Sequence, residues 1–151
     1  MTEADEFWNE FLKATGRDEE ERCAGDLNFE AKGFVADEMI ALVLSGKKTA
    51  FFTSWSTYAI DQEPVPVSGE LYLVLDRNEK PVCVIETQSV QVIPFNEVTW
   101  EMAKLEGEDE NLEVWREKKR EYLEEEGDIM GFEFTPDIKL VFQTFSVVYK
   151  K

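Results

Sequence analysis

The chain has 151 residues, of which 43% are hydrophobic and 13% aromatic, enough for one domain with a buried core. Its 33 acidic and 16 basic residues give a formal net charge of −17, which repels polyanions and argues against duplex DNA as a partner. It contains no histidine, which excludes Ser-His and Cys-His catalytic pairs and the commonest zinc ligand.

Helical and extended patterns are mixed along the chain without a regular alternation. The first helix is expected over residues 3–16, where Phe7, Trp8, Phe11 and Leu12 have helical spacing before Gly16. The remaining predicted elements are, in chain order, a charged connector over 16–26, a helix over 36–46 ending at Gly46, a strand over 49–55, a loop over 61–69, a strand over 70–76, a hairpin turn over 77–81, one long strand or two bent ones over 82–95, helices over 99–107 and 111–127, and one strand or a pair over 138–150. This mixture predicts an α+β fold, with an antiparallel sheet curled over helices.

Cysteine usage and hydropathy predict a cytoplasmic protein. The segment "MTEADEFWNEF" lacks the basic start and apolar run of a signal peptide. No segment approaches the roughly 20 apolar residues that a membrane span needs, so no membrane partner is expected. Cys23 and Cys83 are expected as small core residues, and the sequence does not decide whether they form a disulfide.

A turn with two lysines, Gly46-Lys47-Lys48, separates the second predicted helix from the strand that follows it. In the structural interpretation, Gly46 caps the helix and the lysines complement the negative end of its dipole. In the functional interpretation, a lysine projects from this rigid base into a cleft. Composition alone favours the structural one.

Acidic side chains gather around Gly107, between two helical stretches, at Glu106, Glu108, Asp109 and Glu110. A carboxylate held by such a turn suits acid–base work or the recognition of a base edge. The alternative is a solvated connector in which Asp109 or Asn111 caps the next helix. The spacing does not match an EF-hand, and no phosphate loop is present, so neither a metal nor a cofactor is expected.

These segments together resemble the ASCH family (the activating-signal-cointegrator homology domain), whose fold is similar to the RNA-binding PUA domain. The resemblance is carried by "FWNEFLKATG", "VADEMIALVLSGKKTA", the long segment from "VSGELYLVLDRNEKPVCVIETQ" to "EMAKLEGEDENLEVWREKKREYL", and "FQTFSVVY". It covers nearly the whole chain and implies a single ASCH domain over 1–151, with an N-terminal helical extension over about 1–35. The implied fold is a PUA-like, curled antiparallel or mixed β-barrel-like sheet with flanking helices.

The resemblance implies that Lys48 and Glu106 face a nucleoside-sized cleft. Small bacterial members of the family are amidohydrolases that remove the acetyl group from N(4)-acetylcytidine, and other members bind or cut RNA. In the hydrolases a threonine three residues after the lysine completes the set, but here Phe51 occupies that position. The candidate catalytic residues are Lys48, Glu106 and Thr53, with Thr53 or water as the attacking group, and the candidate substrate-binding residues are Lys47, Thr49, Phe51, Trp55 and Trp115.

A second departure follows Trp115, where relatives often carry a histidine one turn later and this chain has Lys119. The expected partner is a small nucleoside or a short RNA, and the sequence carries no signal of oligomeric state. Three functions stay open. They are amide hydrolysis, non-catalytic binding of RNA or a modified nucleoside, which an aromatic Phe51 favours, and an interaction domain whose cleft has decayed.

Overall fold

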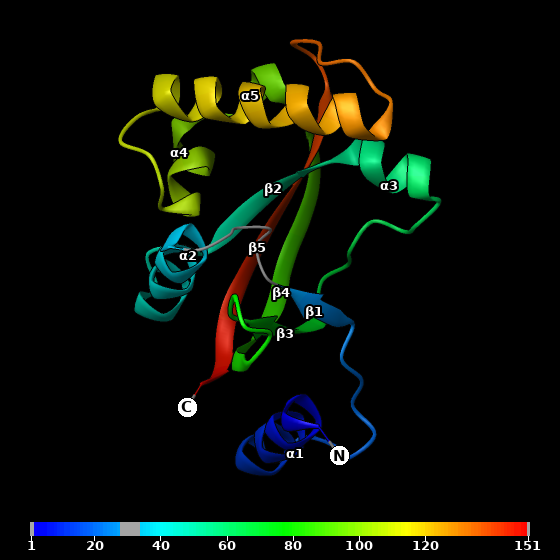
Figure 1. Ribbon diagram of the computed structural model, residues 1–151, viewed down its shortest axis with the longest axis vertical. Helices are drawn as coiled ribbons and strands as arrows, with labels where there is room; N and C mark the ends of the chain where they lie inside the picture. Colours follow the sequence, from blue (N-terminus) through cyan, green and yellow to red (C-terminus); the bar gives the residue numbers. More distant parts are fainter. Residues whose placement is uncertain (1, 28–33, 151) are drawn as a thin grey trace. The chain divides into compact units, whose positions relative to one another are not determined.

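The computed structural model of the chain describes residues 2–27 and 34–150 (Figure 1). Its elements are, in chain order, α1 Glu3–Thr15, β1 Gly25–Leu27, α2 Phe34–Ser45, β2 Ala50–Ser54, α3 Trp55–Asp61, β3 Leu71–Leu75, β4 Pro81–Pro94, η1 Phe95–Glu97, α4 Trp100–Ala103, η2 Lys104–Glu106, α5 Leu112–Met130 and β5 Lys139–Lys150. Within the described residues, none of these helices has the length and apolar character needed to span a bilayer.

The five strands have the hydrogen-bonded order β1-β3-β4-β5-β2. β1 pairs with β3 in parallel, whereas the β3–β4 and β2–β5 pairs are antiparallel. The sheet is therefore mixed, and together with the helices it gives the predicted α+β class. The segments 82–95 and 138–150, which the sequence left open as one strand or two, each form one continuous strand.

The chain packs into two compact units, and β4 and β5 contribute residues to both. The first unit comprises Met1–Lys47, Ser68–Gln88 and Phe145–Lys151. Its helix α1 begins at Thr2, whose hydroxyl accepts a hydrogen bond from the backbone N–H of Asp5 in a capping box. The helix buries the predicted apolar face against β3 and β4, through Phe7, Phe11, Leu12, Leu71, Leu73 and Val84.

The second unit comprises Lys48–Val67 and Ser89–Thr144. The long helix α5, yellow to orange in Figure 1, contacts the short α4. Trp115 and Leu123 on its inner face are fully buried in a core with residues of β2, β4 and β5. The members of that core are Ala50, Phe52, Ile93, Phe95, Val98, Ala103, Trp115, Leu123, Ile138, Leu140 and Phe142.

Two short elements were not predicted. β1 has three residues and overlaps the end of the segment taken as a charged connector. It was missed because its pairing with β3 depends on residues more than forty positions away. α3 was also missed, since Trp, Thr and Tyr favour strands and its N-cap, Ser54, makes no side-chain capping bond. It has no fully buried residue and ends at Gln62, whose φ is +56°.

Cys83 is buried, as expected, but Cys23 is exposed, so the expectation that both are core residues is wrong for Cys23. Both thiols are free. Burial raises the pKa of Cys83 to about 12, because the thiolate would lose its hydration in an apolar environment. Cys23 follows a run of charged residues on the surface of the first unit, where no apolar pattern could have placed it inside.

Candidate functional site

The lysine turn begins with a glycine in the left-handed region. Gly46 has a φ of +81°, its N–H donates to the carbonyl of Val43, and the N–H of Lys47 donates to the carbonyl of Leu42. This pair of bonds is a Schellman motif, which ends α2 and explains why a glycine is needed at this position. Lys47 is exposed, whereas Lys48, the next residue, is buried with 3% of its surface accessible.

Glu106 is the last residue of η2, the short turn that continues α4. Gly107 follows with a φ of +72°, so the chain reverses direction directly after the carboxylate. The backbone N–H of Thr49 donates to the carbonyl of Leu105 at 2.8 Å, which holds the start of β2 beside η2. The two sequence motifs, 58 residues apart, therefore meet at this bond and bring Lys48 to Glu106.

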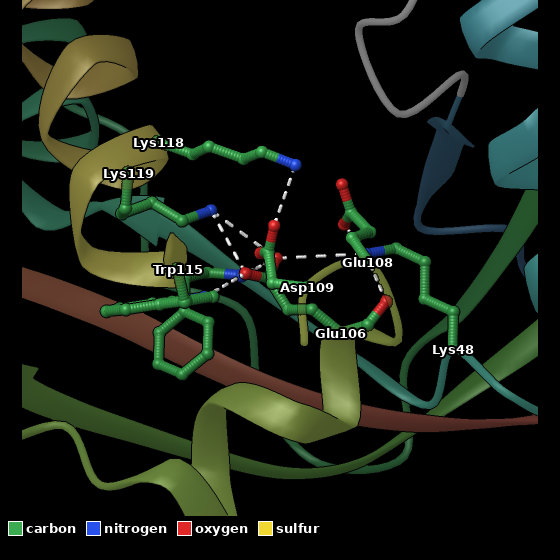
Figure 2. Close-up of polar contacts among 8 residues, drawn as sticks. Lys48, Glu106, Glu108, Asp109, Trp115, Lys118 and Lys119 are labelled. Atoms are coloured by element: carbon green, nitrogen blue, oxygen red, sulfur yellow. Dashed lines mark hydrogen bonds and ion pairs between the residues drawn. The ribbon is translucent and has the colours of Figure 1, made fainter. Parts of the chain in front are cut away.

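Lys48 is enclosed by carboxylate and carbonyl oxygens (Figure 2). Its Nζ atom lies 2.7 Å from Oε2 of Glu108 and 3.7 Å from Oε2 of Glu106, and it donates to the backbone carbonyl of Glu106 at 3.4 Å. A buried ammonium needs such partners, because its hydration is lost on burial. Glu108 is partly exposed and so links the buried lysine to the surface.

Four groups of the second unit contact the carboxylate of Glu106, and two of them belong to α5. The indole Nε1 of Trp115 donates to Oε1 at 2.6 Å, and the backbone N–H of Phe52 donates to Oε2 at 3.3 Å. Lys119 lies 3.2 Å from Oε1, and Figure 2 shows it approaching Glu106 from the side opposite Lys48. With Lys48, these groups occupy about the four acceptor positions that a carboxylate offers.

Helix α5 supplies both Trp115 and Lys119. The side chain of Asn111 caps it by accepting from the N–H of Val114 at 2.9 Å, which confirms one of the two predicted caps. Trp115 and Lys119 are one turn apart and thus share a face. Lys118 points to Asp109 instead, at 2.8 Å, and forms a second ion pair nearer the surface (Figure 2).

Three aromatic rings surround the ammonium group of Lys119. Its Nζ atom lies 5.8 Å from the ring centroid of Phe52, 5.7 Å from that of Trp115 and 5.5 Å from that of Tyr122. All three distances fall within the range of cation–π attraction. Phe52 and Trp115 also contact each other edge to face, with centroids 5.0 Å apart.

Glu106 remains ionised despite its burial. Burial raises the pKa of its carboxyl, but attraction to Lys119 and Lys48 and the hydrogen bonds from Trp115 and Lys119 outweigh that cost. The net result is a pKa below the ordinary value of 4.5. At neutral pH the site therefore contains a fixed carboxylate, which accepts hydrogen bonds well and takes up protons poorly.

Three other predicted residues, Phe51, Thr53 and Trp55, lie apart from this cluster. Side chains alternate along β2, and Phe52 points to the core that includes Trp115, so Phe51 and Thr53 belong to the opposite face. The hydroxyl of Thr53 pairs with that of Tyr58 at 3.1 Å. Trp55 is exposed beneath the ammonium of Lys139, 5.2 Å from its ring centroid.

The structure thus brings together Lys48, Glu106 and Trp115, and separates Thr53 and Trp55 from them. Sequence reasoning missed Phe52 and did not assign Lys119 to the site, although it noted that Lys119 takes the place of a histidine. The spacing of Lys119, one helical turn after Trp115, could have indicated that it shares the site. No sequence pattern indicated Phe52, because which face of β2 turns toward the site depends on what packs against that strand.

A hollow of about 930 Å³ is present in the first unit, lined by α1, the connector after it and β3. Its lining residues include Asp5, Trp8 and Glu21, and neither Lys48 nor Glu106 is among them. Across residues 2–27 and 34–150, no group of three or more Cys, Asp or Glu side chains is arranged to hold a metal ion.

The comparisons with known proteins agree on one family. The model of the ASCH domain matches residues 26–149. The crystal structure of an ASCH domain from Lactobacillus crispatus JV V101 is 31% identical, with a TM-score of 0.89 over 97% of this chain and 94% of that one. A protein from Enterococcus faecalis V583 is 29% identical, with a TM-score of 0.87 over 96% of this chain and 87% of that one. A search of curated proteins gave no match. These similarities confirm the predicted PUA-like α+β fold.

Proposed function

The chain belongs to the ASCH domain family, and we propose that it binds a modified nucleoside beside Lys48 and Glu106 without hydrolysing it. The observation that carries this proposal is the buried, ionised carboxylate of Glu106 with aromatic rings next to it. A fixed carboxylate accepts hydrogen bonds from the N–H groups of a base edge, and aromatic side chains stack on the base itself.

The ligand exchanges places with the most accessible partner of Glu106. Lys119 has 15% of its side chain exposed, compared with 3% for Lys48, so it is the partner that can leave with least rearrangement. Trp115 and the N–H of Phe52 keep the carboxylate in position when Lys119 moves away. A neutral nucleoside also avoids the repulsion that a formal net charge of −17 exerts on a long polyanion.

Two features argue against hydrolysis. The low pKa of Glu106 makes it a weak base, since proton transfer is most efficient when the pKa lies near the working pH. The residue three positions after Lys48 is Phe51, which offers no hydroxyl group for nucleophilic attack. Thr53, the nearest alternative in sequence, has its hydroxyl engaged with Tyr58.

Amide hydrolysis is the second candidate, and the proximity of Lys48 to Glu106 favours it. In this alternative, water attacks the acetyl carbonyl of N(4)-acetylcytidine, the ammonium of Lys48 stabilises the oxyanion, and cytidine and acetate leave. Glu106 then orients the substrate. Thr53 can replace water only if its side chain reaches the same carbonyl from the opposite face of β2.

Calorimetric titration with N(4)-acetylcytidine and with cytidine, alongside an assay for released cytidine, tests both candidates. We expect saturable binding without turnover in the unmodified protein, and loss of binding in Lys48→Ala and Glu106→Gln. Glu110→Gln, the same change at an exposed acidic residue, is the matched control. Turnover that Lys48→Ala abolishes would replace the binding proposal with the hydrolase.

Two further results separate the remaining alternatives. Binding of a short RNA that weakens steeply with added salt, with no nucleoside binding, would identify an RNA-binding domain instead. Turnover gained only in Phe51→Thr would show that the unmodified protein recognises the substrate but lacks the hydroxyl group needed for nucleophilic attack. If neither ligand binds to the folded protein, the proposal is wrong.

A further inference from the structure

We propose that Phe52, Trp115, Tyr122 and Glu106 form a binding site for a small primary amine, and that the ammonium group of Lys119 occupies this site in the structure. The amine would take the volume of the Lys119 side chain and leave the contacts of Lys48 unchanged. The amine would occupy the side of Glu106 that faces α5, where the proposed nucleoside would also displace Lys119, but its binding requires no nucleoside to bind.

The arrangement around Lys119 is that of a cation site. Three ring centroids lie 5.5–5.8 Å from its Nζ atom, and Oε1 of Glu106 lies 3.2 Å away. Aromatic faces and one carboxylate are the groups that recognise organic ammonium ions, since the ring faces are electron-rich and the carboxylate balances the charge. A surface lysine paired with one acid does not have this environment.

Lys118 provides the internal comparison. It is adjacent on the same helix and also pairs with a carboxylate, that of Asp109 at 2.8 Å. Its side chain is 64% exposed, whereas that of Lys119 is 15% exposed. The two lysines are thus the same residue type on one helix but project from different faces, and only Lys119 has aromatic surroundings.

The site keeps its shape when the lysine side chain leaves. Phe52 stacks on Phe142 at 4.6 Å and contacts Trp115 at 5.0 Å, so its ring is fixed by packing that does not involve Lys119. Glu106 retains the hydrogen bonds from Trp115 and the N–H of Phe52 and the ion pair with Lys48. A preformed site needs little ordering when it binds a ligand, which favours affinity.

The tethered lysine limits how tightly a free amine binds. A group held by a short flexible tether has an effective concentration on the order of millimolar, so a free amine must reach that range to compete with Lys119. Removal of the tethered group removes the competition. The chemistry that suits the site is thus a compact primary ammonium, whose N–H groups replace those of Lys119 on the carboxylate.

Rescue of Lys119→Ala with n-propylammonium chloride tests the proposal directly, because alanine plus n-propylammonium contains the heavy atoms of the lysine side chain. We expect this variant to melt at a lower temperature than the unmodified protein. n-Propylammonium should raise its melting temperature saturably, by about 3 to 6 °C at ten times the dissociation constant. Equal concentrations of sodium chloride, which controls for ionic strength, or of neutral 1-propanol, which controls for apolar contact, should not raise the melting temperature of this variant.

Two matched variants control for a general salt or crowding effect. Lys118→Ala, which removes the exposed lysine and keeps Lys119, should be stabilised by n-propylammonium no more than the unmodified protein, because Lys119 still competes for the site. Tyr122→Leu in the Lys119→Ala background should weaken the amine by about two- to fivefold, because one ring face is lost. A folded Lys119→Ala protein that responds equally to n-propylammonium and sodium would overturn the proposal.

A measurement on the unmodified protein keeps the test independent of how the variant folds. The ε-methylene protons of Lys119 should resonate upfield of those of Lys118, because three rings lie close to the former. Addition of n-propylammonium in the millimolar range should move the Lys119 signals toward those of Lys118 as the side chain is displaced. Coincident signals for the two lysines, or shifts that sodium chloride produces equally, would also overturn the proposal.

Discussion

The Nζ atom of Lys119 and the Oε1 atom of Glu106 lie 3.2 Å apart, so a lysine of α5 pairs with the buried carboxylate. Burial raises the pKa of Glu106, but attraction to Lys119 contributes to lowering it below the ordinary value. Lys48 holds the same carboxylate from the other side. Because two lysines depend on one buried carboxylate for charge compensation, loss of that negative charge should lower the stability of the folded protein.

Glu106→Gln should strongly destabilise the protein. The amide still accepts from Trp115 but no longer compensates Lys48 and Lys119, which stay buried or half-buried. We expect the free energy of unfolding to fall by roughly 3–5 kcal/mol, which is the typical cost of removing one partner of a buried ion pair. Urea denaturation measures the change, with Glu110→Gln as control. A loss equal to that of the control would mean that the cluster contributes no net stability.

Stability should also depend on pH in the acid range. The pKa of Glu106 is lower in the folded chain than its ordinary value of 4.5, so below pH 4.5 the unfolded chain binds a proton that the folded chain does not. The contribution of Glu106 is therefore complete above pH 4.5 and is lost as the pH falls through its lower folded pKa. The difference in unfolding free energy between the unmodified protein and Glu106→Gln should narrow below pH 4.5. A difference that stays constant would contradict the pKa assignment.

Gly127→Ala should destabilise the protein even though alanine favours helices. A Cβ atom at this position would overlap the backbone carbonyl oxygen of Phe132, where the chain folds back after α5. Overpacking of this kind costs typically 1–3 kcal/mol, more than the gain in helix propensity. Thermal unfolding should show a lower midpoint, whereas Glu125→Ala, an exposed change in the same helix, should have little effect. An unchanged midpoint in Gly127→Ala would show that Phe132 moves aside freely.

The two cysteines should differ in reactivity. Burial raises the pKa of both thiols, to about 12 for Cys83, but only Cys23 is exposed to a reagent in solution. A thiol reagent at pH 8 should modify one cysteine rapidly in the folded protein and both in denaturant. Cys23→Ser should abolish the rapid reaction and leave the slow one. Rapid modification of the Cys23→Ser protein would mean that the first unit opens readily around Cys83.

Local sequence patterns determined the main elements of this protein. Apolar spacing placed α1, α2 and α5, the glycine at position 46 marked the end of α2, and Asn111 was one of two residues recognised as a cap for α5. The i,i+4 pair of Arg120 and Glu124, at 2.7 Å, also follows from spacing along one helix. These features depend on residues within a turn or two of each other, so the sequence alone is sufficient to find them.

Only the tertiary structure decided how the candidate site is built. The family resemblance indicated Lys48 and Glu106, but the contact of Lys119 with Glu106 and the ring of Phe52 beside it depend on how α5, η2 and β2 pack together. The same holds for β1, which exists through its pairing with β3, and for Cys23, which is exposed. Periodicity specifies which face of an element is apolar, but the partner of a charged group is set by contacts between distant segments, which no local pattern encodes.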